Sequence, residues 1–79
     1  MKLKKEMNNM HSLKTERAEL FFSYETLVGF RTEGKTVVIQ NQWGSTTGKH
    51  LNHIDGGNKA ARFTPEKFAN ELNDRGLAW

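Results

Sequence analysis

The stretch from residue 20 to residue 40 constrains the fold of this chain most, because its pattern is that of paired β-strands. From residue 22 to residue 30 every second position carries an aromatic or β-branched side chain, which is the period of one face of a strand. These positions are Phe22, Tyr24, Thr26, Val28 and Phe30. Residues 36–40 form a second β-branched run, and the Glu33-Gly34 pair between the runs is a turn signal. The two runs are therefore predicted to form an antiparallel hairpin.

The first of these runs leaves two alternatives open. It is either one long strand, with Gly29 at a bend or a bulge, or two short strands separated by a break near residues 23–25. Residues 59–63 are a candidate third strand on the hairpin. The predicted sheet thus has two or three strands.

A short helix is predicted after the hairpin, beginning in the polar loop at residues 41–47 and ending after Ile54. Thr46 or Thr47 is the expected N-cap, because a threonine hydroxyl accepts a hydrogen bond from a free N–H group of the first turn. The segment Asp55-Gly56-Gly57-Asn58 is expected to end the helix, because its glycines suit the left-handed conformation that commonly ends a helix.

A second helix is predicted near the C-terminus. Thr64 is its expected N-cap, Pro65 suits its first position, and Gly76 ends it. Trp79 is expected to pack back on the body. The predicted buried face of this helix consists of Phe68, Ala69, Leu72 and Leu77.

Together these elements predict an α+β fold in which both helices pack on one face of the antiparallel hairpin. Residues 18–79 are predicted to be this single small domain, and residues 1–17 a basic N-terminal arm. The apolar residues of the arm are spaced by four, three and three positions, as on one helical face: Leu3, Met7, Met10 and Leu13. We therefore expect the arm to be a frayed helix or a flexible segment that orders on a partner.

The arm holds the whole charge excess of the chain. Residues 1–17 contain five basic and two acidic residues, whereas residues 18–79 contain seven of each. A basic arm can bind phosphate backbones or an acidic protein face, and the alternative is a solvated leader. Its basic residues are Lys2, Lys4, Lys5, Lys14 and Arg17.

The densest cluster of chemically active side chains lies between Trp43 and Asp55. Residues 44–49 resemble a phosphate loop, but only three residues separate the two glycines where that motif needs four, so NTPase chemistry is not predicted. Hydroxyls, free N–H groups at a helix start and a lysine still suit one phosphate or carboxylate, the alternative being plain helix capping. The predicted binding residues are Trp43, Thr46, Thr47, Lys49, His50 and His53.

The two histidines of this cluster do not predict a metal centre or a catalytic site. His50 and His53 share a helical face, but no third ligand has suitable spacing. Ser45 is close in sequence, yet nothing in the sequence indicates an oxyanion hole. No metal, cofactor or catalytic residue is therefore predicted, and the chain is expected not to be an enzyme.

The composition excludes several classes of protein. The chain has no cysteine, which excludes disulfides and cysteine-based zinc sites. No apolar run approaches the roughly 20 residues of a membrane span, so a cytoplasmic protein without membrane contact is expected. A chain of 79 residues supports only a modest core, which makes a homo-oligomer an open alternative. Trp43 in its polar loop is either a lid on the core or an exposed anchor for a partner.

Two segments resemble a group of small uncharacterised bacteriophage proteins, which carry a Tyr-x-Thr-Pro-Val-Ala-like strand and a Thr-Thr-x-Lys-His-hydrophobic motif. The similarity covers about residues 20–55, with Leu27 where the group often has proline and Gly29 in place of alanine. The resemblance implies a phage origin and expression in an infected bacterium, but no activity. The matching segments are Tyr24-Glu25-Thr26-Leu27-Val28-Gly29 and Trp43-Gly44-Ser45-Thr46-Thr47-Gly48-Lys49-His50-Leu51-Asn52.

The function predicted from these observations is that of a non-enzymatic phage accessory protein in the host cytoplasm, which binds and modulates a host protein, such as one of a defence system. One alternative is an accessory protein that binds nucleic acid through its basic arm, with an affinity that falls steeply with salt. The other is sequestration of a small phosphorylated ligand at the Thr46–His50 cluster. The arm and residues 43–55 are the candidate surfaces.

Overall fold

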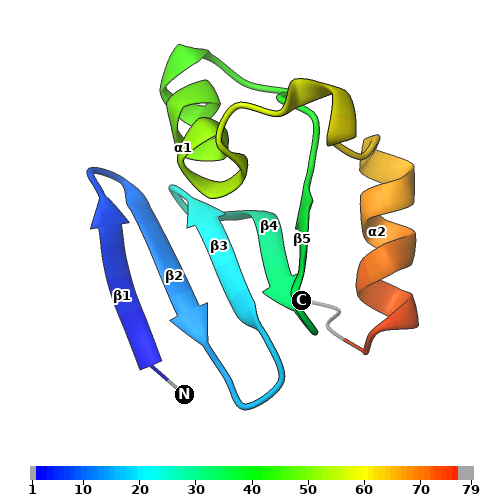
Figure 1. Cartoon of the computed structure of the whole chain (residues 1–79). Helices are drawn as coiled ribbons and strands as arrows, with labels where there is room; N and C mark the ends of the chain where they lie inside the picture. Colours follow the sequence, from blue (N-terminus) through cyan, green and yellow to red (C-terminus); the bar gives the residue numbers. More distant parts are fainter. Residues whose placement is uncertain (1, 77–79) are drawn as a thin grey trace.

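The structure, a computed structural model, describes residues 2–76. It is an α+β fold with a five-stranded antiparallel sheet in which each strand pairs with the next along the chain (Figure 1). The strands are β1 (Lys2–Met7), β2 (Met10–Lys14), β3 (Glu19–Ser23), β4 (Thr26–Thr32) and β5 (Lys35–Val38). The helices are α1 (Ser45–Asp55), the short 3-10 helix η1 (Lys59–Ala61) and α2 (Pro65–Asp74).

The predicted hairpin around Glu33-Gly34 is confirmed as the pair β4–β5. Both turn residues have positive φ, 53° and 76°, as a two-residue type I′ turn requires. The run before this turn is two strands rather than one, because the chain reverses at Tyr24-Glu25 between β3 and β4. The pairing shifts at Val28, so the bulge falls one residue before Gly29.

The prediction of a frayed helix or flexible arm at residues 1–17 is wrong, because this segment forms strands β1 and β2. Asn9 turns the chain with a φ of 62°, a left-handed conformation that asparagine tolerates. The turn brings Leu3 opposite Leu13 and Met7 opposite Met10. Spacings of four, three and three therefore fit a hairpin with a two-residue turn as well as they fit a helix. With these strands the sheet has five members, more than the two or three predicted.

Helix α1 has the predicted end but a different start. Gly56 forms the left-handed C-cap, as expected. The N-cap is Gly44, without a side-chain hydrogen bond, so neither Thr46 nor Thr47 caps this helix. Both threonines lie inside the first turn, which places their hydroxyls beyond the capping position.

Residues 59–63 do not form the candidate third strand. Three of them make the helix η1, and only Phe63 bridges to the sheet, in parallel with Ile39. Helix α2 begins as predicted, with the Thr64 hydroxyl accepting a hydrogen bond from the N–H of Lys67. Phe68 is buried, whereas Ala69 is exposed, contrary to prediction.

Leu72 on α2 is partly buried against the core, as predicted. The predictions for Leu77 and Trp79 lie outside the described residues.

The two helices contact opposite faces of the sheet, not one face as predicted. Successive residues of a strand point to opposite faces. A Cβ atom added to Gly29 would lie 3.4 Å from the Cδ1 atom of Ile54 on α1, whereas the ring of Phe30 lies 5.8 Å from that of Phe68 on α2. Val37 and Val38 are consecutive and both buried, so this end of the sheet needs a cover on each face.

Candidate functional site

Helix α1 divides the predicted binding residues into an inner and an outer set. Thr47 and His50 are buried against the sheet, and His50 is only 2% exposed. Trp43, with 43% of its surface exposed, lies in the loop before the helix and is not a lid on the core. The outer set is Trp43, Thr46, Lys49 and His53. The cluster is therefore not one site, because its members face in two directions.

The inner set forms a buried chain of hydrogen bonds. The Ser23 hydroxyl lies 3.0 Å from the Thr47 hydroxyl and 2.7 Å from Nδ1 of His50, and Nε2 of His50 lies 3.0 Å from the carbonyl oxygen of Asn8. A carbonyl only accepts, so Nε2–H is the donor to Asn8. In the neutral imidazole Nδ1 then accepts from Ser23, and Ser23 accepts from Thr47.

This chain of hydrogen bonds contains a serine beside a histidine, as in catalytic serine–histidine pairs, but here the serine is not exposed. Ser23 is only 3% exposed, so its hydroxyl is almost entirely closed to solvent. The group on the other side of His50 is the carbonyl of Asn8, in the β1–β2 turn. The N–H of Tyr24 also donates to the carbonyl of Asn9, at 2.7 Å. These bonds hold α1 and the two hairpin turns together.

The outer histidine joins α1 to the edge of the sheet. Nε2 of His53 lies 3.3 Å from a carboxylate oxygen of Glu6, and the Ser12 hydroxyl donates to the other oxygen at 2.8 Å. Burial raises the pKa of Glu6, but the hydrogen bonds from Ser12 and His53 and the charge of Lys4 outweigh it, so the pKa lies below its ordinary value. Glu6 is thus held as a carboxylate.

A buried ion pair closes the loop after α1, and the sequence pattern did not indicate it. Arg62 donates to Asp55 from Nε at 2.8 Å and from Nη2 at 3.1 Å, and Nη2 also donates to the amide oxygen of Asn52 at 2.9 Å. Burial raises the pKa of Asp55, but the hydrogen bonds from Arg62 and from the N–H of Gly57 outweigh it and lower the pKa. The only signal was a basic residue seven positions after an acid across a glycine turn.

A pocket of about 480 Å³, lined mostly by residues of polar type, lies beside α1. Lys49 projects from the helix and Lys59 from η1, and neither forms an ion pair within residues 2–76. No acidic residue lies in the first turn of α1. The pocket is lined by Gln40, Asn41, Ser45, Gly48, Lys49, Asn52, Lys59 and Arg62. Of the predicted binding residues, only Lys49 lines this pocket.

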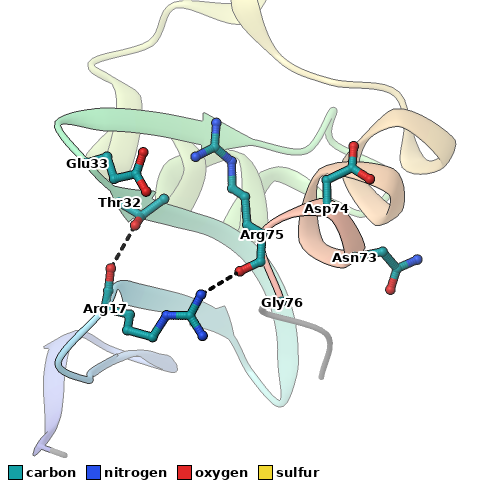
Figure 2. Close-up of a pocket in the computed structure, with 7 residues that line it drawn as sticks. All are labelled: Arg17, Thr32, Glu33, Asn73, Asp74, Arg75 and Gly76. Atoms are coloured by element: carbon teal, nitrogen blue, oxygen red, sulfur yellow. Dashed lines mark hydrogen bonds between the residues drawn. The ribbon is translucent and has the colours of Figure 1, made fainter.

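A larger pocket, of about 810 Å³, lies at the C-terminal end of α2 (Figure 2). The Arg17 guanidinium points to the main-chain carbonyl of Arg75 and donates to it at 3.2 Å, while Thr32 donates to the carbonyl of Arg17 at 2.7 Å (Figure 2). Its acids, Glu33 and Asp74, balance its two arginines. These contacts attach the end of α2 to the sheet, and Arg17 serves there rather than in a basic arm.

The remaining basic residues of the predicted arm lie on β1 and β2. The side chains of Lys4, Lys5 and Lys14 are exposed, and Lys4 lies 3.7 Å from Glu6. The backbone of Lys2 pairs with Lys14. Because β1 is the first strand in the sheet order, these lysines mark a basic edge.

Beside this edge lies an apolar surface, which we call the hairpin face. Leu3 is 66% exposed and Tyr24 is 53% exposed, although both are large and apolar. They border a shallow hollow of about 370 Å³. The hairpin face consists of Leu3, His11, Leu13, Phe22, Tyr24 and Glu25. The sequence did not indicate this surface, because Leu3 and Leu13 were assigned to a helix.

No group of three or more His, Cys, Asp or Glu side chains in residues 2–76 is arranged to hold a metal ion. Within the same residues no helix has the length and apolar character that crossing a bilayer requires.

Comparison with known proteins gives a family but no activity. Neither a curated protein nor a solved structure is significantly similar to the chain. A family model described as a family of unknown function, DUF8033, matches residues 1–71. The match begins one residue before β1 and ends within α2, so it covers the whole sheet and helix α1. The expected membership of an uncharacterised family is thus confirmed, and the chain belongs to the DUF8033 family.

Proposed function

We propose that this chain is a small non-enzymatic accessory protein that binds and modulates a host protein, and that the hairpin face is its docking surface. The observation that supports the proposal most is the exposure of Leu3 and Tyr24 around an apolar hollow. Isolated apolar side chains are common on surfaces, but a contiguous apolar group with a charged border is typical of protein interfaces. The phage origin and the host partner, such as a defence protein, rest on the resemblance of residues 20–55.

The charge distribution favours a protein partner over nucleic acid. Lys4 is paired with Glu6, and Arg17 is directed to the end of α2. Among the described side chains of the edge this leaves Lys5 and Lys14 without an ion pair, and two lysines are few for a phosphate backbone. An apolar hollow also contributes little to phosphate binding.

The test is affinity capture from infected cells, with and without nuclease, using three forms of the protein. The hairpin-face variant Leu3→Thr/Tyr24→Asn keeps a β-former in β1 and puts asparagine at the positive φ of Tyr24, 57°. The control variant Trp43→Ala/Lys49→Ala alters the exposed side of α1 instead. We expect a stoichiometric host protein that resists nuclease, is lost with the hairpin-face variant and is kept with the control.

Two outcomes would contradict the proposal. Recovery that vanishes with nuclease supports the nucleic-acid alternative. Loss of the host protein with the control variant only would move the docking surface to residues 43–55.

The pocket beside α1 favours a second candidate, the binding of a small phosphorylated ligand. Lys49 and Lys59 face this pocket without acidic partners in the described part of the chain. Thr47 and His50, which were expected to take part, are directed into the core. This candidate predicts that nucleotides or inorganic phosphate raise the melting temperature, and that Lys49→Ala/Lys59→Ala abolishes the increase while Lys67→Ala does not.

A further inference from the structure

Strand β1 is an open edge of the sheet. It pairs with β2 on one side, and no strand within residues 2–76 pairs with its other side. The opposite edge is partly occupied, because Phe63 exchanges backbone hydrogen bonds with Val38 and Gln40 just past β5. An unpaired edge presents N–H and C=O groups that can accept a further strand. Among the described residues β1 is therefore the edge that is open along its whole length.

The charge of the edge selects against a second copy of this chain. Lys4 and Lys5 are adjacent and exposed on β1, and Lys14 is exposed on the neighbouring strand. Antiparallel pairing of two β1 strands would bring lysines of one copy opposite or next to lysines of the other, which is unfavourable. The one acid on β1, Glu6, is already bound by Ser12 and His53. An incoming acidic segment would instead meet a net positive charge. Lys5 forms no ion pair among the described residues, and the ammonium of Lys4, although 3.7 Å from a carboxylate oxygen of Glu6, remains largely exposed.

The register of β1 further defines the incoming segment. Leu3 and Lys5 lie on the face of β1 that carries the hairpin face, and Lys4 lies on the other. Residues directly opposite one another on paired strands are about 5 Å apart at Cβ. A strand on β1 would thus place one side chain beside Leu3, at the apolar hollow, and two others beside Lys4 and Lys5.

Resting on the proposed function, we propose that the host protein docks by adding an acidic extended segment to the outer edge of β1. The segment runs antiparallel to β1 and contains two acidic residues followed by an apolar one. The two acidic side chains lie opposite Lys5 and Lys4, and the apolar side chain packs beside Leu3 at the hairpin face. Backbone hydrogen bonds to β1 supply affinity, and the three side chains supply specificity.

The first test is selection of random extended peptides against the full chain by display. We expect enrichment of two adjacent acidic residues followed by an apolar one. Selection against Lys4→Glu/Lys5→Glu is expected to lose this motif, and the acidic peptide should bind that variant about tenfold more weakly. Lys35→Glu/Lys67→Glu is the matched control, because it reverses two exposed lysines elsewhere, one of which also lies beside a glutamate. Enrichment of basic or amphipathic helical peptides, or of no sequence at all, would overturn the inference.

The second test distinguishes strand addition from simple contact with the hairpin face. Each amide of the selected peptide is N-methylated in turn, which removes one donor. In strand addition alternate amides point to β1, so methylation at every second position should weaken binding about tenfold and methylation between them far less. A uniform response overturns strand addition.

The variants separate this inference from the proposed function. If binding requires Leu3 and Tyr24 but is unchanged by N-methylation and by charge reversal, the hairpin face is still the docking surface. Only the proposal of an acidic strand is then contradicted. If binding is unchanged in Leu3→Thr/Tyr24→Asn, the proposal that the hairpin face is the docking surface is contradicted. Each variant is first checked for folding by circular dichroism.

Discussion

The two ends of the sheet differ in how well they are covered. At β4–β5 the sheet has α1 on one face and α2 on the other, and Val28, Phe30 and Val37 are fully buried. At β1–β2 one face carries Leu3, which is largely exposed, and Leu13, which is only partly buried. The covered end therefore supplies most of the apolar burial that stabilises so small a domain, and the open end keeps apolar surface available for a partner.

The largest expected effect is the loss of a ring from the covered end. Phe30→Ala should lower the free energy of unfolding by about 3–5 kcal/mol, because it removes a fully buried side chain and leaves a cavity against Phe68. Leu13→Ala at the open end should cost about 1 kcal/mol, since its surface is only partly removed from water. Urea unfolding followed by circular dichroism measures both. Equal losses would show that the two ends do not differ in burial.

The next effect is expected at the connection between the two ends. His50→Ala should cost about 2–3 kcal/mol, because it removes a buried ring, leaves the buried Ser23 hydroxyl with Thr47 alone and takes the donor from the partly buried Asn8 carbonyl. His53→Ala is the matched control on the same helix. It should change the unfolding free energy by about 0.5 kcal/mol or less, because His53 is exposed. If both variants unfold alike, the buried hydrogen-bond chain does not hold α1 on the sheet.

Acid should weaken both ends through two carboxylates. The folded-state pKa values of Glu6 and Asp55 lie below their ordinary values of 4.5 and 3.8. Their contribution is therefore complete at a pH above those values and is lost as the pH falls through the lowered folded-state values. We expect the unfolding free energy to decrease below about pH 4.5 in the native chain. Glu6→Gln/Asp55→Asn should be less stable at neutral pH and should show a flatter decrease.

Single substitutions at neutral pH, followed by urea unfolding, distinguish the two carboxylates. Asp55 holds the buried Arg62 guanidinium, whose side chain is only 4% exposed, so Asp55→Asn leaves a charge without its partner. Glu6→Gln affects an exposed histidine and a hydroxyl instead. Asp55→Asn should therefore cost more at pH 7. The opposite order would indicate that the hairpin edge depends on Glu6 more than the loop after α1 depends on Asp55.

The parts of the fold that the sequence predicted are those set by local chemistry. The Glu33-Gly34 turn, the Thr64-Pro65 helix start and the Gly56 helix end each depend on backbone preferences of a few adjacent residues. The N-terminal hairpin could not be distinguished from a helix, because its apolar spacing fits both. The helix placement also required tertiary information, although the consecutive buried pair Val37 and Val38 already indicates a strand covered on both faces.

The candidate site was less predictable than the fold, because it depends on which way side chains point. Counting residue types around Lys49 and His50 located a chemically rich segment. It could not show that His50 faces Ser23 across 27 positions or that Arg62 folds back on Asp55. The hairpin face is formed from β1, β2, β3 and the turn between β3 and β4, and no short sequence window contains it.

The smallest effect on stability is expected at the open end of the sheet. Leu3→Thr should change the unfolding free energy by no more than about 0.5 kcal/mol, because Leu3 is mostly in water already and threonine is a good strand former. The same substitution, with Tyr24→Asn, is expected to abolish partner capture. Urea unfolding of the single variant and capture by the double variant therefore measure different properties of one surface. A loss of several kcal/mol in Leu3→Thr would mean that the open end is part of the core, and the apolar hollow would then contribute to folding rather than to recognition.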